Sequence, residues 1–505
     1  MEYKYNNPVV KGFHPDPSVC RVDDTYYLVC SSFEYFPGVP IYKSQDLVNW
    51  ELLGNCLDRG SQLNLKEAKA SGGIYAPTIR YHEGTFFMTT TNVSDIGNFI
   101  VYTDNPAGDW SEPVLVSQEG IDPSLYFEDN KCYFMSTGFL DGNNCIMLCE
   151  INPFTGEQLS KSKAIANGTE SRSAEAPHIY KYGEYYYLLL AEGGTEYGHR
   201  VTIQRSKDIY GPYEACPHNP ILTNKDYDDL DIACIGHADL TDDKDGNLYA
   251  VCLGIRTLKI GDGNVMLHNL GRETFLSSFK LNKEGWPEFI NNGIVAKTMS
   301  SNLPKKPEKQ VKQEFITDFS RNKIPHEFIH IRNPQTKNYI INPEENSIKL
   351  LGSSASLSAS RAQPTFIGVR QSEFKEHAEV KVKLNSGVAG ISTYYNHEHH
   401  YDLILRKEKD KYILALRKQI YDLEALSAQI ELESIKDLKL HIFTNYEFHR
   451  FCYQIGDGEI KTLGKGATAA LCTEVTRQMT FTGTLIGMFS EAGEAEFKDF
   501  KITEM

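Results

Sequence analysis

Short runs rich in aromatic and β-branched residues recur along the first half of the chain, each bounded by Gly, Asp or Asn. Such side chains fit the pleated, half-buried surface of a strand, and the bounding residues favour tight turns. This half shows no long segment with the 3.6-residue spacing of an amphipathic helix. The pattern therefore predicts an all-β domain whose strands include residues 25–29, 85–88, 132–135, 185–189 and 248–251.

A short motif precedes each of these runs and gives the first half of the chain an internal repeat. The five copies cover residues 14–19, 74–79, 121–125, 175–179 and 236–240. Repeats of roughly 45–60 residues that contain only strands are typical of propeller blades. We therefore predict a five-bladed β-propeller over residues 1–299.

The character of the sequence changes after this region. Residues 300–313 are rich in Lys, Pro and Ser, which is typical of a linker without a core of its own. Short alternating strands then resume, separated by turn residues. We predict that residues 314–505 form a second all-β domain, a β-sandwich of the jelly-roll, concanavalin-like kind.

The propeller geometry gives the repeat a chemical meaning, because the innermost strand of each blade starts beside the central axis. Matching positions in the five repeats should therefore surround one small volume. The residues at or next to these positions are Asp16, Tyr75, Ala76, Asp122, Glu175, Ala176 and His237. Three carboxyl groups and one imidazole are thus expected at one end of the axial channel.

Three acids at one place suit the cleavage of a glycosidic bond, which requires two carboxyl groups with separated pKa values. One carboxyl must be protonated to donate to the leaving oxygen, and the other must be ionised. A third acid beside the donor raises the donor's pKa by repulsion between like charges. A single Asp-Pro pair is typical of a turn, so it is the matched position of the acids that favours a hydrolase.

Composition narrows the classes of partner. The formal net charge of −15 disfavours nucleic acids and anionic lipid surfaces. The N-terminal residues lack the pattern of a signal peptide, and no apolar stretch is long enough to span a bilayer, so we expect a cytoplasmic protein with no membrane partner. The eleven cysteines include no Cys-x-x-Cys pair, which favours reduced, buried thiols.

Nine stretches distributed over nearly the whole chain carry a joint resemblance to a known family. They are residues 12–18, 33–40, 71–77, 120–125, 175–180, 191–195, 270–274, 389–396 and 481–483. In order and spacing they resemble glycoside hydrolase family 43, and within it the branch of β-xylosidases and α-L-arabinofuranosidases. The second domain is similar to the accessory sandwich of that branch, which contributes to the rim of the active site.

The resemblance implies an exo-acting, inverting glycosidase that releases terminal α-L-arabinofuranose or β-D-xylose from xylan- or arabinan-derived oligosaccharides. Asp16 would be the general base, Glu175 the general acid, and Asp122 the group that tunes the pKa of Glu175. In an inverting enzyme the base and the acid lie roughly 6.5–9.5 Å apart. The residues implied to bind the terminal sugar are Phe33, Tyr75, Ala76, Thr195, His237, Arg272 and Phe481.

Three departures from the family pattern bear on the substrate. Tyr75 stands where well-known β-xylosidases have Trp, and His268 stands where they have Cys. Residues 135–139 lack a Trp that often forms the leaving-group side of the pocket. The three acids are unaffected, but the choice between a xyloside and an arabinofuranoside stays open, with the motif at residues 174–178 favouring the arabinofuranosidases.

Two other functions fit parts of the pattern. A non-catalytic, sugar-binding propeller needs aromatic platforms but no ring of acids. A fructosidase would have Asn-Asp-Pro and Arg-Asp-Pro where this chain has Pro-Asp-Pro and Ile-Asp-Pro. The hydrolytic mechanism requires no cofactor, although a structural calcium or sodium ion could occupy the propeller channel near His237, and a homo-oligomer is compatible with the sequence.

Overall fold

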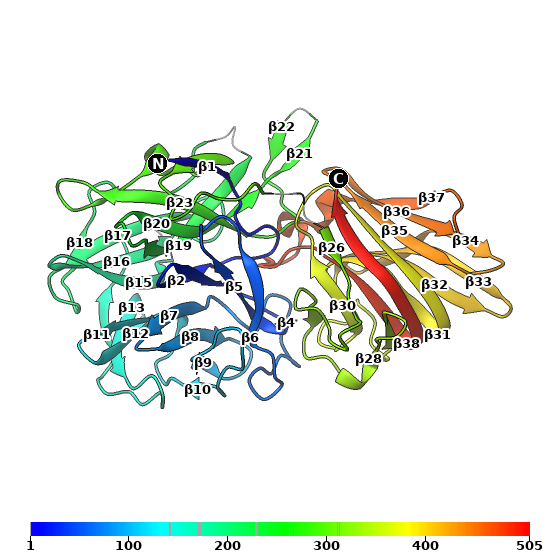
Figure 1. Ribbon diagram of the computed structural model, residues 1–505, viewed down its shortest axis with the longest axis horizontal. Helices are drawn as coiled ribbons and strands as arrows, with labels where there is room; N and C mark the ends of the chain where they lie inside the picture. The colour runs from blue at the N-terminus through cyan, green and yellow to red at the C-terminus, as the bar shows by residue number, and fades with distance from the viewer. Residues whose placement is uncertain are drawn as a thin grey trace.

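The computed structural model describes residues 2–140, 143–169, 173–227, 231–261, 263–310, 312 and 314–505. Two domains made of strands lie side by side, a ring of blades formed by the first part of the chain and a sandwich formed by the last part (Figure 1). The predicted fold class, a five-bladed propeller followed by a β-sandwich, is confirmed. The helical segments in the described ranges are short 3₁₀ turns at Ile290–Gly293, Thr336–Asn338, Thr468–Leu471 and Thr473–Val475.

Each blade is a four-stranded antiparallel sheet. The first blade contains β2 (Ser18–Val22), β3 (Thr25–Val29), β5 (Gly38–Ser44) and β6 (Glu51–Leu57). The second contains β7 (Thr78–His82), β8 (Thr85–Asn92), β9 (Gly97–Thr103) and β10 (Val114–Leu115). The third contains β11 (Ile121–Glu128), β12 (Lys131–Leu140), β13 (Asn143–Ile151) and β14 (Lys163–Ala166).

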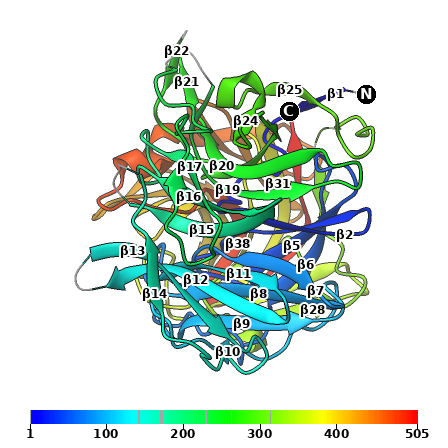
Figure 2. The ribbon, with the colours of Figure 1, turned by 90° about the vertical axis from the view of Figure 1, so that its left-hand side faces the viewer.

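The last two blades follow the same plan. The fourth contains β15 (Glu175–Tyr182), β16 (Tyr185–Glu192), β17 (Arg200–Ser206) and β18 (Glu214–Ala215). The fifth contains β19 (Ile232–Asp242), β20 (Leu248–Arg256), β23 (Glu273–Leu281) and β24 (Pro287–Phe289), with a hairpin of β21 (Leu258–Ile260) and β22 (Gly263–Val265) inserted before β23. The innermost strands β2, β7, β11, β15 and β19 contact one another in a closed ring (Figure 2).

The two ends of the propeller are joined by a small sheet. Strand β1 (Tyr3–Asn6) pairs antiparallel with β25 (Thr298–Ser301). The side chain of Asn7 accepts from the backbone N–H of Leu276 at 2.9 Å and donates to its carbonyl at 3.0 Å, which holds this sheet to the fifth blade. Ser300 and Ser301, predicted to begin the linker, therefore lie in β25. Residues 311 and 313 of that linker lie outside the described residues.

An ion pair with a buried carboxylate lies among the inner strands of the propeller. Arg80 on β7 donates to both carboxylate oxygens of Asp239 on β19, at 2.8 and 3.1 Å. The hydroxyls of Ser18, at 2.5 Å, and Tyr180 also donate to this carboxylate. Burial alone would raise the pKa of Asp239, but Arg80 and its other partners lower it well below its ordinary value. Three of the inner strands besides β19 thus meet on one carboxylate.

The second domain is built around two long strands, β31 (Glu376–Asn396) and β38 (Leu485–Glu504). Strand β31 pairs with β35 through its first residues and with β32 through its last, so it runs through both parts of the sandwich. The remaining strands are β26 (Glu314–Ile316), β28 (Tyr339–Asn342), β29 (Ser347–Leu351), β30 (Thr365–Arg370), β32 (His399–Glu408), β33 (Lys411–Ile420), β34 (Leu423–Leu432), β35 (Leu438–Thr444), β36 (Phe448–Ile455) and β37 (Lys461–Ala467). Inward-facing apolar residues of these strands form the second large core.

The domains share a buried interface. Strand β4 (Tyr35–Phe36) of the propeller pairs with β27 (His330–Ile331) of the sandwich. Arg332, 2 % exposed, donates to the carbonyls of Ala68 in the propeller and Ser360 in the sandwich, at 2.7 and 2.5 Å. A hydrophobic cluster also includes residues of both domains. The sandwich is therefore fixed against the propeller by backbone pairing, a buried guanidinium and apolar packing.

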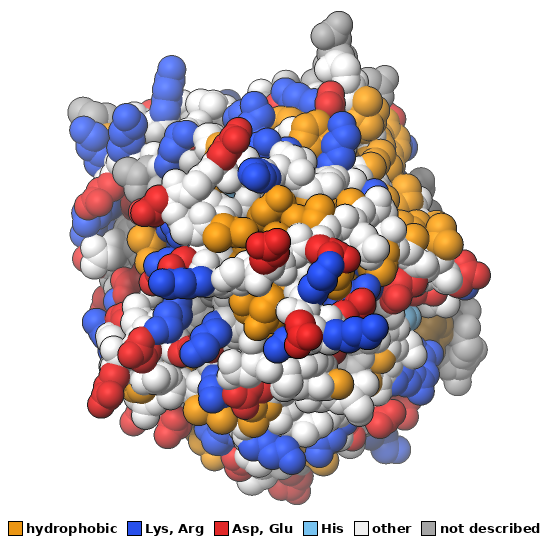
Figure 3. All heavy atoms as spheres, turned by 90° about the vertical axis from the view of Figure 1, so that its right-hand side faces the viewer, with side chains coloured by type: hydrophobic (Ala, Val, Ile, Leu, Met, Phe, Trp, Pro, Cys, Tyr) orange, Lys and Arg blue, Asp and Glu red, His pale blue; other side chains and the backbone are white. Residues whose placement is uncertain are grey.

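The cysteines lie in the core, and charged side chains of both signs lie on the surface. All eleven cysteines are buried, as predicted, and none of them is in a disulfide. Among the described residues, no helix is long and apolar enough to cross a membrane. At the sandwich end of the molecule, acidic and basic side chains are interspersed instead of forming a field of one sign (Figure 3).

The axial ion pair gives a stability prediction. Replacing Arg80 with Ala leaves the charge of Asp239 buried and poorly compensated, so we expect the propeller to lose about 3–5 kcal/mol of unfolding free energy. Arg21, paired with Asp242 at 2.9 Å on the surface, is the matched control, and Arg21→Ala should cost about 1 kcal/mol or less. Urea titration followed by tryptophan fluorescence measures both. Equal losses in the two variants would contradict the structural role of the axial pair.

Candidate active site

A cavity of about 300 Å³ lies where the inner strands of the propeller begin, and the sandwich contributes to its wall. All ten residues predicted for the site line it: Asp16, Phe33, Tyr75, Ala76, Asp122, Glu175, Thr195, His237, Arg272 and Phe481. It is also lined by residues that the sequence analysis missed: Ile121, Ala191, Gly194, Glu196, His199 and Met479. Glu196 directly follows the stretch 191–195, which carries part of the family resemblance. His199 and Met479 match no position of the repeat.

The backbone turns the key side chains toward this cavity by a shared device. Asp16, Asp122, Ala176 and His237 have φ values of 54°, 52°, 52° and 46°, in the left-handed region. Pairing is shifted by a bulge at the Asp122, Ala176 and His237 positions. A left-handed residue with a side chain costs roughly 1–2 kcal/mol. The left-handed conformation recurs in four blades, which supports the predicted equivalence of these positions. Ala76, at the matching position of the remaining blade, does not adopt it.

Asp16 is held as a carboxylate. Its Oδ1 accepts from Arg272 Nη1 at 3.0 Å, and its Oδ2 accepts from the Ser31 hydroxyl at 2.5 Å. His237 Nδ1 lies 3.5 Å from Oδ1. Burial favours the neutral acid, but Arg272, His237 and Ser31 outweigh it and lower the pKa of Asp16 below its ordinary value. Asp16 is therefore ionised at neutral pH.

The pKa of Asp122 is shifted in the opposite direction. It is 9 % exposed, and its pKa is raised well above the ordinary range by burial and by the nearby charges of Glu175 and Asp16. Arg272 opposes this rise from a distance. Because the charge of Glu175 is one of the causes that raise the pKa of Asp122, ionising both carboxyl groups is unfavourable. One proton is consequently retained in this pair at a pH at which Asp16 has lost its own.

Arg272 connects the acids to the wall of the cavity. Besides Asp16, its Nη1 donates to the Thr195 hydroxyl at 3.0 Å, and its Nη2 approaches the Phe481 carbonyl at 3.4 Å. The guanidinium also faces the rings of Phe33 and Phe481, 5.7 and 5.3 Å from their centroids. A planar cation in this position can hold a carboxylate and sugar hydroxyls together.

Aromatic rings from both domains form one side of the cavity. The ring of Phe481, from the sandwich, lies 5.6 Å from that of Phe33 and 6.1 Å from that of Tyr75. The Phe481 backbone N–H donates to Ser71 of the propeller at 2.8 Å. A Cβ at Gly483 would lie 2.2 Å from the Leu270 carbonyl, so only glycine permits this close approach. The sandwich loop thus closes the cavity on one side.

Two buried histidines complete the polar lining. Burial lowers the pKa of His237, and it lowers the pKa of His199 to about 3, so both rings are neutral at neutral pH. His199 donates from Nδ1 to the Cys234 carbonyl at 3.0 Å. A neutral imidazole at His237 beside the Asp16 carboxylate suits a sugar hydroxyl. Deeper in the channel Asp239 does not suit a cation, because Arg80 already neutralises it.

The residues that depart from the family pattern lie in different parts of the structure. Tyr75 lines the cavity. His268 lies outside the lining and contacts the sandwich, with its Nδ1 2.7 Å from Glu474. Residues 135–139 lie in β12 and do not line the cavity, and Phe139 is 77 % exposed. Of these positions, Tyr75 is therefore the one placed to select among sugars.

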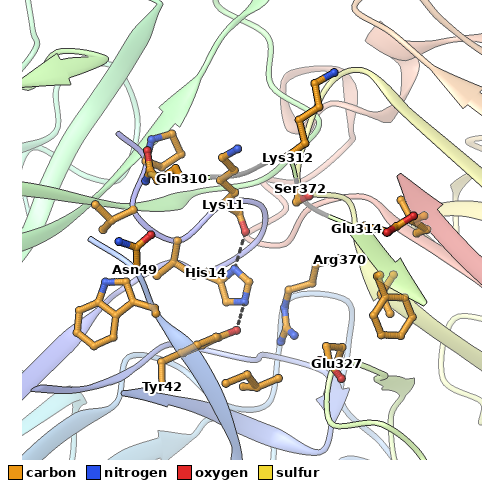
Figure 4. A pocket seen from close by; sticks show the side chains of 18 of the residues that line it. Lys11, His14, Tyr42, Asn49, Gln310, Lys312, Glu314, Glu327, Arg370 and Ser372 are labelled. Carbon is orange, nitrogen blue, oxygen red and sulfur yellow. Dashed lines mark hydrogen bonds between the residues drawn. The ribbon is translucent and has the colours of Figure 1, made fainter. Parts of the chain in front are cut away.

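A second cavity, of about 610 Å³, lies where the propeller meets the sandwich (Figure 4). Its histidine, His14, donates from Nδ1 to the Lys11 carbonyl at 2.9 Å and accepts at Nε2 from the Tyr42 hydroxyl at 2.6 Å. Burial and the nearby Arg370 charge lower the pKa of His14, which keeps the ring neutral. None of the ten predicted residues lines this cavity. Its greater size therefore does not make it the candidate site.

Sequence profiles match both parts of the chain. Residues 5–287 match the profile of glycosyl hydrolases family 43, and residues 316–503 match the β-xylosidase C-terminal concanavalin A-like domain. A non-reducing end α-L-arabinofuranosidase of Bacteroides ovatus is 38 % identical over 496 residues, which cover 96 % of this chain and 91 % of the relative. A xylosidase/arabinosidase of Butyrivibrio fibrisolvens is 35 % identical over 513 residues, which cover 96 % of each chain.

Solved structures show the same architecture over the full length. The Bacteroides ovatus xyloglucan PUL GH43B structure superposes with a TM-score of 0.92 at 36 % identity, covering 99 % of this chain and 100 % of the other. A xylan β-1,4-xylosidase of Bacillus halodurans superposes with a TM-score of 0.91 at 31 % identity, with the same coverage. The similarity therefore extends through both domains and includes the segments that form the cavity.

Proposed function

The chain belongs to family 43 of the glycosyl hydrolases, and we propose that it is an exo-acting, inverting enzyme that releases terminal pentoses from xylan- or arabinan-derived oligosaccharides. The observation that carries the mechanism is the difference between its acids. Asp16 is ionised, and the Asp122–Glu175 pair retains a proton within the same cavity. A sugar-binding protein without catalysis would need no such difference, so this alternative is not favoured.

Asp16 is suited to act as the general base. It is ionised and lies at the cavity wall, where it can take a proton from a water molecule that attacks the anomeric carbon. Ser31 and Arg272 each donate to one of its oxygens, so the carboxylate is fixed in orientation. Arg272 therefore both lowers the pKa of the base and positions it.

Glu175 is suited to act as the general acid. It is partly exposed, while Asp122 is buried beside it. Of the two coupled carboxyl groups, Glu175 is thus the one that can reach the leaving oxygen of a bound sugar. Asp122 raises the proton affinity of the pair through like-charge repulsion, which keeps the donor protonated until bond cleavage.

The shape of the cavity supports exo attack. Its volume of about 300 Å³ is at the low end for small-molecule sites, and Phe481 closes one side. Such a pocket admits the end of a chain more readily than its middle. Phe33, Tyr75 and Phe481 offer apolar ring surfaces, while Arg272, Thr195 and His237 offer groups for the hydroxyls of the terminal sugar.

Other properties remain predictions. A structural calcium or sodium ion in the propeller channel near His237 stays a prediction from the sequence, and no step of the mechanism depends on it. A cytoplasmic location and a homo-oligomeric state are also proposals from the sequence. A cytoplasmic enzyme of this kind would act on short oligosaccharides after import.

The acid assignment predicts a substrate-dependent loss. Glu175→Gln should lower kcat on unactivated oligosaccharides by about 10²–10⁴-fold, since the leaving oxygen then departs without a proton. The loss should be smaller with nitrophenyl pentosides, because nitrophenolate is a good leaving group. Glu196→Gln, a change of the same kind in the same cavity, is the control and should retain most activity. Near-full turnover of unactivated substrate by Glu175→Gln would refute the assignment.

The coupling of the two carboxyl groups predicts a change in pH dependence. Asp122→Asn removes the carboxyl group that disfavours a second charge in this pair, so the proposed acid should lose its proton at lower pH. The alkaline limb of kcat/KM should therefore move to lower pH, while the acidic limb, set by Asp16, should stay in place. Steady-state rates across pH 4–9 measure both limbs. An unmoved alkaline limb would contradict a tuning role for Asp122.

The pentose preference can be measured directly. We propose that arabinofuranosides are released faster than xylosides, on the basis of the motif at residues 174–178 and the Bacteroides ovatus relative. The test compares kcat/KM on an arabinose-branched xylo-oligosaccharide with that on xylobiose. Tyr75→Trp should shift this ratio toward xylobiose by about tenfold, equivalent to about 1.4 kcal/mol of differential stabilisation. A ratio unchanged by Tyr75→Trp would exclude this residue as the selecting group.

A further inference from the structure

A cluster of two histidines and one glutamate lies on the sandwich, outside the catalytic cavity. His377 and Glu379 are on β31, and His441 is on β35 directly opposite Glu379 in the antiparallel register. Ala378 and Val380, which alternate with the β31 members of the cluster, are buried in the sandwich core. Because strand residues alternate between faces, the three cluster side chains share the other face of the sheet.

The spacing of the potential ligand atoms is that of a metal site. His377 Nε2 lies 3.1 Å from His441 Nδ1 and 3.9 Å from Glu379 Oε2, and His441 Nδ1 lies 3.5 Å from the same oxygen. Zinc bound tetrahedrally at 2.0–2.2 Å from each ligand has ligand atoms about 3.3–3.5 Å apart. The geometry points to a binding site for Zn²⁺ or a transition-metal ion of similar size, held by His377, Glu379 and His441.

The ligands are oriented by their surroundings. The ring of His377 stacks on Phe443, with centroids 4.1 Å apart and planes 3° apart. Lys501 lies 3.3 Å from Glu379 Oε1 and leaves Oε2 toward the histidines. Metal-binding carboxylates are commonly held by such a second partner. The cluster can therefore accept an ion with little rearrangement.

The cluster is also accessible to solvent. The side chains of His377 and Glu379 are 19 % and 27 % exposed, which leaves room for water as a fourth ligand.

The location of the site indicates a structural role and not a catalytic one. It joins neighbouring strands of the sandwich, and none of its residues lines the catalytic cavity. Another histidine group at residues 397–400 is less suited, because His399 bonds the Ala470 carbonyl and His400 bonds Asp402. A metal ion that binds only the folded state would raise the stability of the sandwich by mass action.

The test is a titration of the full-length protein, freed of metal with a chelator, with zinc chloride. Isothermal titration calorimetry should show a site that is weakened at least about tenfold in His377→Ala and in Glu379→Gln. The melting temperature of the wild type should rise with zinc, and this rise should be lost in both variants. His326→Ala, which changes an exposed histidine of the same domain, should bind zinc as the wild type does.

The outcomes are separable from folding and from catalysis. Melting curves recorded in chelator should be the same for wild type and variants, which shows that lost binding is not lost folding. Anomalous diffraction at the zinc edge should place the ion between the three side chains. Wild-type affinity in both His377→Ala and Glu379→Gln, or zinc binding no tighter than millimolar in the wild type, would overturn the proposal.

Discussion

The ionisation of Asp16 beside acids that keep a proton is the constraint on which the site depends. A carboxylate removed from water is unfavourable unless charges or hydrogen bonds compensate it. Arg272 donates directly to Asp16 but acts on Asp122 as a more distant charge. One guanidinium placed unequally between the acids, together with the repulsion inside the Asp122–Glu175 pair, therefore separates the pKa values. Acid–base chemistry in this cavity follows from that asymmetry.

The position of Arg272 links the catalytic chemistry to the second domain. Its guanidinium faces the rings of Phe33 and Phe481 and approaches the Phe481 carbonyl. Phe481 is in turn held by Ser71, and Arg332 fixes the sandwich against the propeller. The sandwich is thus part of the wall that confines the charge of Arg272 and excludes water. Both domains are needed to form one pocket, which agrees with the full-length similarity to the relatives.

The sequence was sufficient for the architecture and for the acids, because strand periodicity and the offset of Asp16 and Asp122 in the repeat are local signals. Glu175 required a one-residue shift, which corresponds to the bulge beside Ala176. The roles of Arg272 and Phe481 came from the resemblance alone, since contacts between segments over 200 residues apart leave no periodic signal. The Arg80–Asp239 pair and His199 were not predicted, because nothing local distinguishes an inward-facing polar residue from an exposed one.

The backbone is strained at the mouth of the propeller, whereas the polar groups along its axis are hydrogen-bonded. Four side-chain-bearing residues at the mouth adopt left-handed φ values, each at a cost of roughly 1–2 kcal/mol. Such strain persists only where the surrounding structure fixes the backbone. Along the same inner strands, Ser18, Arg80 and Tyr180 donate to the buried carboxylate of Asp239, and this network joins four blades. The network holds the inner strands in place, so the mouth can carry groups arranged for chemistry and not for stability.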